Sequence, residues 1–255
     1  MDKIHKKTNS MKIKQLTIIL TILIGPFLIA QEQLRIEYEL TEPEENFKYS
    51  DLPNALDIKV PKRYYELILN KDESIWKSFE KVDNNQNDGT VGRVTFFSPY
   101  GDIYKNVREK VKMFEANLNS KKYIVKDSLQ EINWKIMQES KEILNIQVNK
   151  AIYINKEKGI ELIAWYAPKL NFKNGPDEYW NLPGLILEIE NLTYFDDNSK
   201  MYQTYTATKI ETLPQNKKII KPTKGAIITQ KELDKILEEN FDKMKQMEGE
   251  GVDKD

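Results

Sequence analysis

The sequence predicts an α+β fold that is mostly β: a curved antiparallel sheet or half-barrel with a C-terminal helix packed on it. Short runs of alternating apolar and polar residues recur along the chain, with turns rich in Gly, Pro and Asn between them. The 13 tyrosines, 9 phenylalanines and 4 tryptophans favour strands. One apolar stripe with helical spacing lies near the C-terminus. Because neighbouring runs form successive hairpins, the sheet should be antiparallel.

The N-terminus has the pattern of a secretory signal peptide over residues 1–30. An apolar run of 15 residues, Leu16–Ala30, follows two lysines, whereas a membrane-spanning helix needs about 20 apolar residues. We expect cleavage after Ala30 and a periplasmic or secreted protein with no permanent membrane span after cleavage. An uncleaved anchor is the alternative, because Leu28 is large for its place before the cleavage site. The true start is Met1 or Met11.

The first half of the exported part reads as a series of short strands. Gln33–Leu40 alternates, and Tyr64–Leu69 with Ser74–Val82 reads as a hairpin. The following polar loop, residues 83–89, is a weak match to a calcium loop, and we interpret it as a hydrated turn. Further strands are expected at Val91–Phe97, Asp102–Val107, Met113–Leu118 and Lys122–Asp127. A helix within residues 107–118 is the alternative there.

The pattern is stronger in the second half. Residues 132–137 alternate, and Ile143–Ile154 reads as one long strand. A turn at Lys156–Gly159 returns the chain into the next strand. The remaining strands are expected at Ile160–Ala167, Leu185–Phe195 and Lys200–Glu211.

The chain ends in a helix, expected at residues 229–246. Thr229 and Glu232 have the spacing of a capping box. The apolar residues after them recur at helical spacing and should pack on the sheet, with a partner-binding helix as the alternative. These residues are Leu233, Ile236, Leu237, Phe241 and Met244. Residues 247–255 are expected to form a disordered tail.

We expect the domain to fold around Trp165–Ile189, which holds three prolines and two glycines between two strands. It contains two turn signals, Asn174–Pro176 and Leu182–Leu185. Pro183 and Gly184 suit the central positions of a type II turn, in which the glycine takes a positive φ.

This segment resembles the GLPGLI family of secreted proteins from Bacteroidota-type bacteria. The motif is matched by Asn181–Ile186, supported by Ala164–Tyr166 and by Asn174–Pro176. Elements near Trp134, Glu139 and Lys150 also fit the family pattern. The family's usual glycine, cysteine and arginine are replaced here by Asn181, Val148 and Ile160. The resemblance implies an exported single domain, here residues 31–246, and no particular activity.

The composition excludes several chemistries. The only histidine, His5, precedes the signal core and the chain has no cysteine, so the exported part lacks imidazole and thiol side chains. This removes Ser-His-Asp and Cys-His catalysis and the usual zinc and copper sites. We therefore predict no catalytic residue, no metal and no cofactor. With a net charge of −1 we expect no nucleic-acid binding. A paired acid–base role for Asp177 and Glu178 is the remaining catalytic alternative.

The function we expect is that of a non-enzymatic exported envelope protein. It would be a binding or carrier module for an apolar ligand, a peptide or an envelope partner. The alternatives are a carboxylate-based hydrolase and a structural or assembly partner of an outer-envelope complex. The predicted ligand- or partner-binding residues are Trp165, Tyr179, Trp180, Leu182, Pro183 and Gly184.

Overall fold

The computed structural model describes residues 33–43, 62–81, 101–195, 199–214 and 217–249. All of them belong to one compact unit, Glu32–Asp255. The expected signal peptide at 1–30, the loop at 83–89 and the strand at 91–97 lie outside the described residues. So do residues 250–255 of the expected tail. These remain predictions.

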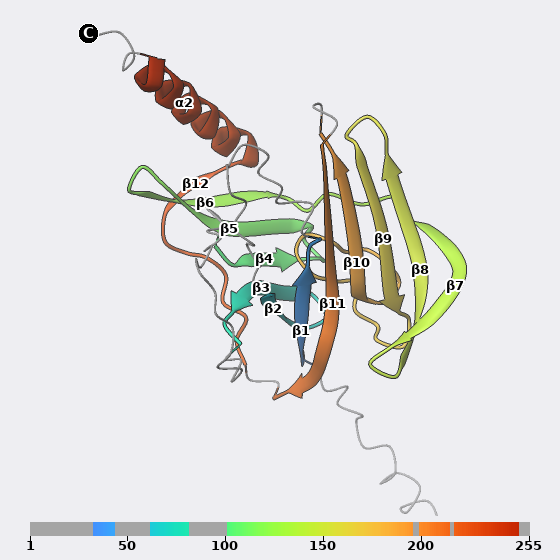
Figure 1. Cartoon of the computed structure of the whole chain (residues 1–255). Coiled ribbons are helices and arrows are strands. Elements are labelled where there is room, and N and C mark those ends of the chain that lie inside the picture. Colours follow the sequence, from blue (N-terminus) through green and yellow to red (C-terminus); the bar gives the residue numbers. More distant parts are fainter. Residues whose placement is uncertain (1–32, 44–61, 82–100, 196–198, 215–216, 250–255) are drawn as a thin grey trace, which may run out of the picture. The chain divides into compact units, whose positions relative to one another are not determined.

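The described strands form one open sheet in the order β12-β6-β5-β4-β3-β2-β1-β11-β10-β9-β8-β7, so β12 and β7 lie at its two edges (Figure 1). All described pairs are antiparallel except β12 with β6. The fold class expected from the sequence is confirmed. The strands are β1 (Gln33–Thr41), β2 (Arg63–Leu69), β3 (Glu73–Phe79), β4 (Ile103–Asn106), β5 (Val111–Leu118), β6 (Lys121–Ser128), β7 (Lys135–Ile143), β8 (Ile146–Asn155), β9 (Ile160–Ala167), β10 (Leu185–Tyr194), β11 (Lys200–Leu213) and β12 (Ala226–Ile228).

The first strand of the described chain is central in the sheet. β1 pairs with β2 on one side and with β11 on the other, where Gln33 lies opposite Leu213. In Figure 1 the strands from β2 to β6 cross the direction of those from β11 to β8, so the sheet is strongly twisted. Apolar and polar residues alternate along the strands, so each strand has one apolar face. The twist brings the apolar faces of these two sets of strands around a shared core.

The prediction of one long strand at Ile143–Ile154 is wrong. The chain instead turns at Leu144–Asn145, between β7 and β8, and both turn residues have positive φ, 52° and 60°. Two such residues give the tight turn that suits a two-residue hairpin. Asn accepts this conformation, but a leucine rarely does, which hides the turn in an apolar run. The helix considered within residues 107–118 is also absent, since β5 occupies most of that range.

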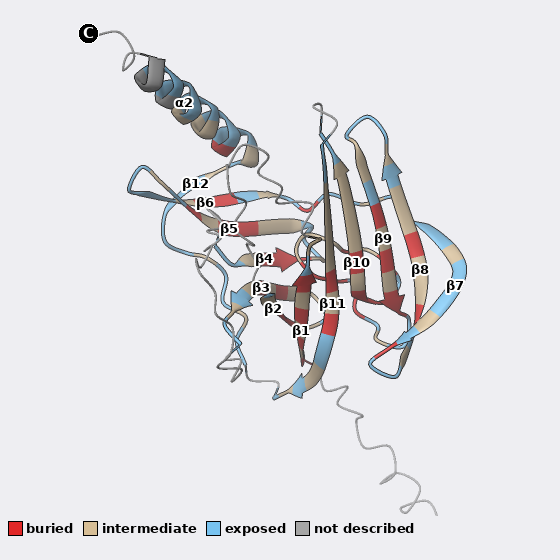
Figure 2. Cartoon of the chain, in the orientation of Figure 1, coloured by how far each residue is buried: buried red, intermediate tan, exposed pale blue. Residues whose placement is uncertain are grey.

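The main core lies between the strands around β1 and the segment that joins β9 to β10. In Figure 2 the buried residues, in red, appear on β1 and β9 and also on other strands of the sheet. Tyr38 on β1 is fully buried and donates its hydroxyl hydrogen bond to the carbonyl of Ile186 at 2.6 Å. Trp76 stacks on Tyr65 with ring centroids 4.9 Å apart. The fully buried leucines and isoleucines of this core are Ile36, Leu67, Leu69, Leu182, Leu185, Ile186, Leu187 and Ile189.

The C-terminal helix α2 (Gln230–Gly249) begins at the expected capping box. The amide of Glu232 donates to Thr229 Oγ1 at 3.2 Å, and the amide of Thr229 donates to Glu232 Oε2 at 2.7 Å. Leu233 is fully buried against Phe114 and the other members of a small cluster on β5 and β6. Farther along, Phe241 is 51% exposed, so the packing expected for the whole stripe is confined to the first turns. Among the described residues, no helix combines the length and the hydropathy needed to cross a membrane.

The turn segment, residues 168–184, joins β9 to β10 and is tied down at both ends. Leu185 N donates to Leu170 O, and Ile186 N donates to Asn174 O, each at 3.0 Å. Trp134 Nε1 lies 2.9 Å from both Trp180 O and Asn181 Oδ1. Asn181 has a φ of 66°, which explains why asparagine can stand where the GLPGLI motif has glycine.

The type II turn expected at Pro183–Gly184 is wrong. No positive φ is found at Gly184, in contrast to Gly159. The amide of Gly184 instead donates to Leu182 O at 2.8 Å. A Cβ atom at Gly184 would lie 2.3 Å from the carbonyl oxygen of Ala167. Glycine is required here because two backbone segments touch.

Candidate functional site

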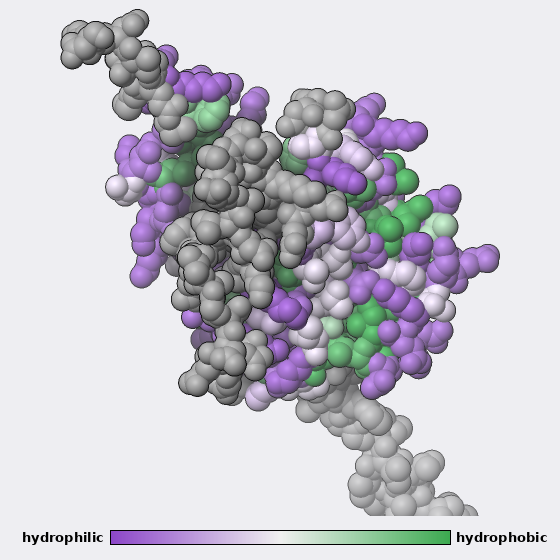
Figure 3. Space-filling view, in the orientation of Figure 1, coloured by the Kyte–Doolittle hydropathy of each residue, from purple (hydrophilic) through white to green (hydrophobic). Residues whose placement is uncertain are grey.

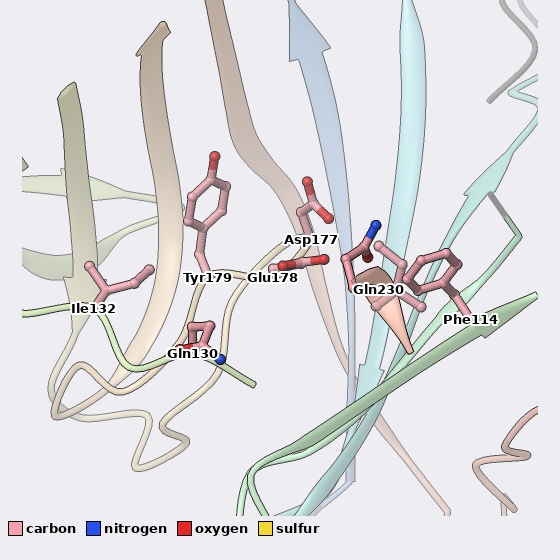
Figure 4. A pocket seen from close by; sticks show the side chains of 8 residues that line it. Phe114, Gln130, Ile132, Asp177, Glu178, Tyr179 and Gln230 are labelled. Atoms are coloured by element: carbon pink, nitrogen blue, oxygen red, sulfur yellow. The ribbon is translucent and has the colours of Figure 1, made fainter. Parts of the chain in front are cut away.

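A pocket of about 490 Å³ lies beside the turn segment. Its walls come from β4, β5, the link between β6 and β7, the turn segment and the first residue of α2. Figure 4 shows the carboxylates of Asp177 and Glu178 between Tyr179 on one side and Gln230 with Phe114 on the other. The lining residues are Ile103, Phe114, Gln130, Ile132, Asp177, Glu178, Tyr179 and Gln230. Four of these side chains are apolar or aromatic and four are polar, so the pocket has an amphipathic lining.

A tight turn of the chain presents the two carboxylates. Tyr179 N donates to Pro176 O at 3.0 Å, and Asp177 inside this turn has a φ of 47°, a conformation that aspartate tolerates. Gly175, just before the turn, is buried, and a Cβ atom there would lie 2.8 Å from the Cβ of Ile186. The turn is therefore pressed onto the core, which fixes the position of the carboxylates.

A fully buried lysine lies close to the turn. Lys105 on β4 has no exposed surface, and its Nζ donates to the carbonyl of Gly175 at 2.7 Å. Burial lowers the pKa of this ammonium to about 7, although the charges of Asp177 and Glu178 oppose the shift. Ser74, the residue opposite Lys105 on β3, is also fully buried, and its Oγ has no hydrogen-bond partner among the described residues. A charged group this deep in a sheet is costly unless its partners are retained.

The two carboxylates differ in how their charges are matched. Lys112 Nζ lies 2.5 Å from Glu178 Oε1 and forms an ion pair with it. Asp177 has no ion pair within 4.0 Å among the described residues. Burial first, and the neighbouring Glu178 second, raise the pKa of Asp177 to about 6, while Lys105 and Lys112 oppose the shift. Asp177 keeps some surface in the pocket but is enclosed by protein on its other sides.

Three tyrosines near Asp177 stay neutral. Burial is the main cause that raises the pKa of Tyr65, Tyr179 and Tyr205, and the charge of Asp177 adds to it in each case. The wall behind the carboxylates therefore supplies aromatic surface and hydroxyl groups, with no further negative charge from phenolate.

The residues predicted as a binding site are brought together only in part. Tyr179 lines the pocket, but Trp180 and Leu182 are core residues, 4% and 1% exposed. Trp180 Nε1 donates to Gln130 O at 2.6 Å, and this hydrogen bond joins the link between β6 and β7 to the core. Pro183 is exposed and Gly184 is buried against β9.

Trp165 lies on β9 in a different environment. The ammonium of Lys141 lies 4.3 Å from its ring centroid, and that of Lys150 lies 5.8 Å from it. Its Nε1 is buried and has no hydrogen-bond partner in the part of the chain that the structure describes. Trp165 is not among the residues that line the pocket.

Sequence reasoning missed Lys105 and most of the apolar pocket wall. One signal was present, because Lys105 follows Ile103 at the two-residue spacing of a strand face. A lysine on the apolar face of a strand is unusual and points to a buried charge. Gln130, Ile132 and Gln230 gave no such signal, since they come from a link and a helix start.

The comparisons with known proteins agree with the fold. A family model described as "Protein of unknown function (Porph_ging)" matches residues 154–188, which include β9, the whole turn segment and the start of β10. No curated protein sequence matches the chain. Two solved structures are similar in fold: "Structure of PNGF-II in C2 space group", at 17% identity and a TM-score of 0.51, and "Structure of PNGF-II in P21 space group", at 18% and 0.50. In both cases the match covers 78% of this chain and 31% of the other. The chain is thus similar to about a third of PNGF-II, at a level that shows the fold alone.

Proposed function

We propose that this protein is an exported binding module that holds a small amphipathic molecule in the pocket beside the turn segment. We further propose that it is a member of the GLPGLI family, on the strength of Asn181–Ile186 and the flanking matches. Location in the periplasm or outside the cell is part of the proposal and is supported by the N-terminal sequence pattern.

The observation that carries the proposal is the composition of the pocket wall. Binding pockets for small molecules commonly measure about 300–1,000 Å³ and combine an apolar wall with a few converging polar groups. Here Ile103, Phe114 and Ile132 supply apolar surface, while Gln130 and Gln230 supply hydrogen-bonding groups. Asp177 and Glu178 add two carboxylates at one end, between flanking side chains (Figure 4).

This wall narrows the ligand class expected from the sequence. A wholly apolar ligand would cover the carboxylates without replacing the water that solvates them, which is costly. An amphipathic ligand avoids that cost by directing polar groups to the carboxylates and its apolar part to the isoleucines.

A second candidate function is acid–base chemistry by the two carboxylates. The raised pKa of Asp177, about 6, lets it hold a proton near neutral pH, while Glu178 forms an ion pair with Lys112. Two neighbouring carboxyl groups in different environments are the pattern of an acid–base pair. An enzyme of this kind would consume a ligand that a binding module returns unchanged.

Native mass spectrometry of the protein isolated from its own envelope tests the proposal. We expect a bound small molecule in the natural chain and its loss in Ile132→Trp, where the larger ring fills the pocket. Ile227→Trp is the matched control, because Ile227 is 68% exposed and is not among the residues that line the pocket.

The same bound molecule in all three proteins would place binding elsewhere, and no bound molecule in any of them would remove the support for a carrier. A chemically altered molecule recovered after incubation would favour the acid–base function.

A further inference from the structure

We propose that the pocket selects ligands that carry an ammonium group, and that Asp177 is the residue that pairs with it. This inference rests on the proposed function and names the chemical class of the ligand. It starts from the charges that surround the pocket, because Glu178 and Lys112 form an ion pair, whereas Asp177 has no ion pair among the described residues.

Glu178 is not the free anion of the pocket. Its carboxylate is 2.5 Å from Lys112 Nζ, a side chain that is only 12% exposed. The Glu178 side chain is itself 46% exposed, so the cost of separating the pair falls mainly on the largely buried ammonium of Lys112, which would be left without its partner. Glu178 is therefore committed to Lys112, and a ligand would meet it as half of a neutral pair.

Lys105 does not neutralise Asp177 by direct contact. Its Nζ is committed to the carbonyl of Gly175, and it has no carboxylate within 4.0 Å among the described residues. Since Lys105 is fully buried, a ligand in the pocket cannot reach it. Its charge acts on Asp177 only from behind the pocket wall.

The wall that a ligand touches is negative. Two of the lining residues are carboxylates, and none is a lysine or arginine. An anionic ligand would meet like charges in this pocket, which opposes its binding. A cation would give Asp177 the close partner that it lacks, and charge-assisted hydrogen bonds of this kind are stronger than neutral ones.

The aromatic residues favour an amine with an apolar body. Tyr179 adjoins the carboxylates, and Phe114 lies across the pocket from it (Figure 4). Aromatic rings attract cations in addition to covering apolar surface. The amide groups of Gln130 and Gln230 can accept further hydrogen bonds from the same ammonium group.

The protonation of Asp177 supports the same inference. Its pKa is raised to about 6 because the carboxylate is buried beside Glu178. A ligand cation would favour the ionised form and lower this pKa. Binding of an amine should therefore weaken as the pH falls below about 6, where Asp177 becomes neutral. The other titratable groups around Asp177 are Glu178, Lys105, Lys112, Tyr65, Tyr179 and Tyr205.

Calorimetric titration of the full chain with three probes of one shape tests the inference. The probes are phenethylamine, phenethyl alcohol and phenylacetate, which present an ammonium, a hydroxyl and a carboxylate on the same ring. We expect the amine to bind at least about tenfold more tightly than the alcohol, and the acid to bind least.

Three variants locate the effect. Asp177→Asn should bring the amine's advantage over the alcohol below about threefold, since the amide carries no charge. Glu178→Gln should reduce it less, because that carboxylate already has Lys112. Glu161→Gln, an exposed carboxylate on β9 that is not among the lining residues, should leave it unchanged.

Each contrary result has a distinct meaning. Equal binding of amine and alcohol, or equal effects of Asp177→Asn and Glu161→Gln, would overturn the amine assignment and leave the pocket as a binding site. Failure of all three probes would also overturn the assignment. If, in addition, no molecule accompanies the protein from its own envelope, the proposed function fails with it.

Discussion

The two ends of the turn segment differ in what they bury. At the closed end, Trp180 and Leu182 are packed into the core, and Gly184 touches the backbone of β9. At the open end, Asp177 and Glu178 carry charges beside a pocket and a buried lysine. The motif-bearing end therefore packs into the core, and the proposed ligand-binding groups are the less distinctive residues a few positions before it.

This difference shows why a sequence motif can be a poor guide to a binding site. The closed end is distinctive because close backbone contact restricts the residue types that fit there. The open end lines the pocket, so we propose that its residues are chosen by what the pocket binds. The variants below test whether the two ends have these separate roles.

The largest effect is expected at the closed end. Gly184→Val should lower the free energy of unfolding by more than about 3 kcal/mol, because its Cβ would overlap the carbonyl of Ala167 and force the backbones apart. Urea denaturation measures this change. The neighbouring Pro183→Ala is the control, since Pro183 is exposed and should cost less than about 1 kcal/mol. Equal losses would contradict the backbone contact.

The buried lysine beside the open end should make the stability of the protein depend on pH. Lys105 has a pKa of about 7 in the folded protein and its ordinary value of 10.5 in the unfolded chain. Between these values the unfolded chain binds more protons, so stability should rise with pH, by an amount on the order of a few kcal/mol. Lys105→Met should abolish that rise in urea denaturation between about pH 7 and pH 10.

The exposed Lys126→Met is the control for this experiment and should keep the slope of the natural protein. Parallel pH curves for Lys105→Met and the natural chain would show that Lys105 is not buried with a lowered pKa.

A smaller loss of stability is expected for Trp134, which lies in the link between β6 and β7 and contacts the closed end of the turn segment. Trp134→Phe removes the hydrogen bonds from Nε1 to Trp180 O and Asn181 Oδ1. Leaving these two acceptors without a donor should cost about 1–3 kcal/mol. Thermal unfolding of the variant beside the natural chain measures it, and an unchanged midpoint would mean that water replaces both bonds.

The smallest change in stability is expected for Asp177, where a substitution should stabilise the protein instead of destabilising it. Asp177→Asn should stabilise the protein by about 1 kcal/mol at neutral pH, because burial disfavours the carboxylate and asparagine tolerates the positive φ. The natural chain should also lose stability as the pH rises from about 4 to about 6, the window in which folded Asp177 holds a proton that the unfolded chain has released. The variant should lack that slope, and a destabilised variant would identify Asp177 as structural.

Much of the fold follows from the sequence, because alternation reports which face of a strand is buried. The hairpin of β2 and β3 and the strands β9, β10 and β11 lie where the pattern placed them. The capping box at Thr229 and Glu232 marked the start of α2 correctly. These features depend on interactions between residues that are close together in the sequence.

The errors come from conformations and contacts that are not local. The Leu144–Asn145 turn was hidden because leucine seldom adopts a positive φ, and the role of Gly184 depends on Ala167, which is distant in sequence. β12 was missed because it has only three residues, which are too few to show an alternating pattern. It pairs in parallel with β6.

The pocket was beyond sequence reasoning for the same reason. Its residues come from five parts of the chain that only the folded sheet brings together. Among the six predicted site residues only Tyr179 lines it. The adjacent carboxylates Asp177 and Glu178 had been recognised as the one catalytic alternative.

The central position of β1 has a consequence for folding kinetics. Gln33, at the start of β1, donates from its side chain to the carbonyl of Lys217, 184 positions later. Pairings between such distant residues form slowly, whereas the hairpins β2–β3, β5–β6 and β8–β9 can form early from adjacent residues. During synthesis, β1 therefore waits without its β11 partner until nearly the whole domain has emerged from the ribosome. A strand edge that stays unpaired for long is prone to aggregate, so a chaperone that shields the β11-facing edge of β1 would have its greatest effect in that interval.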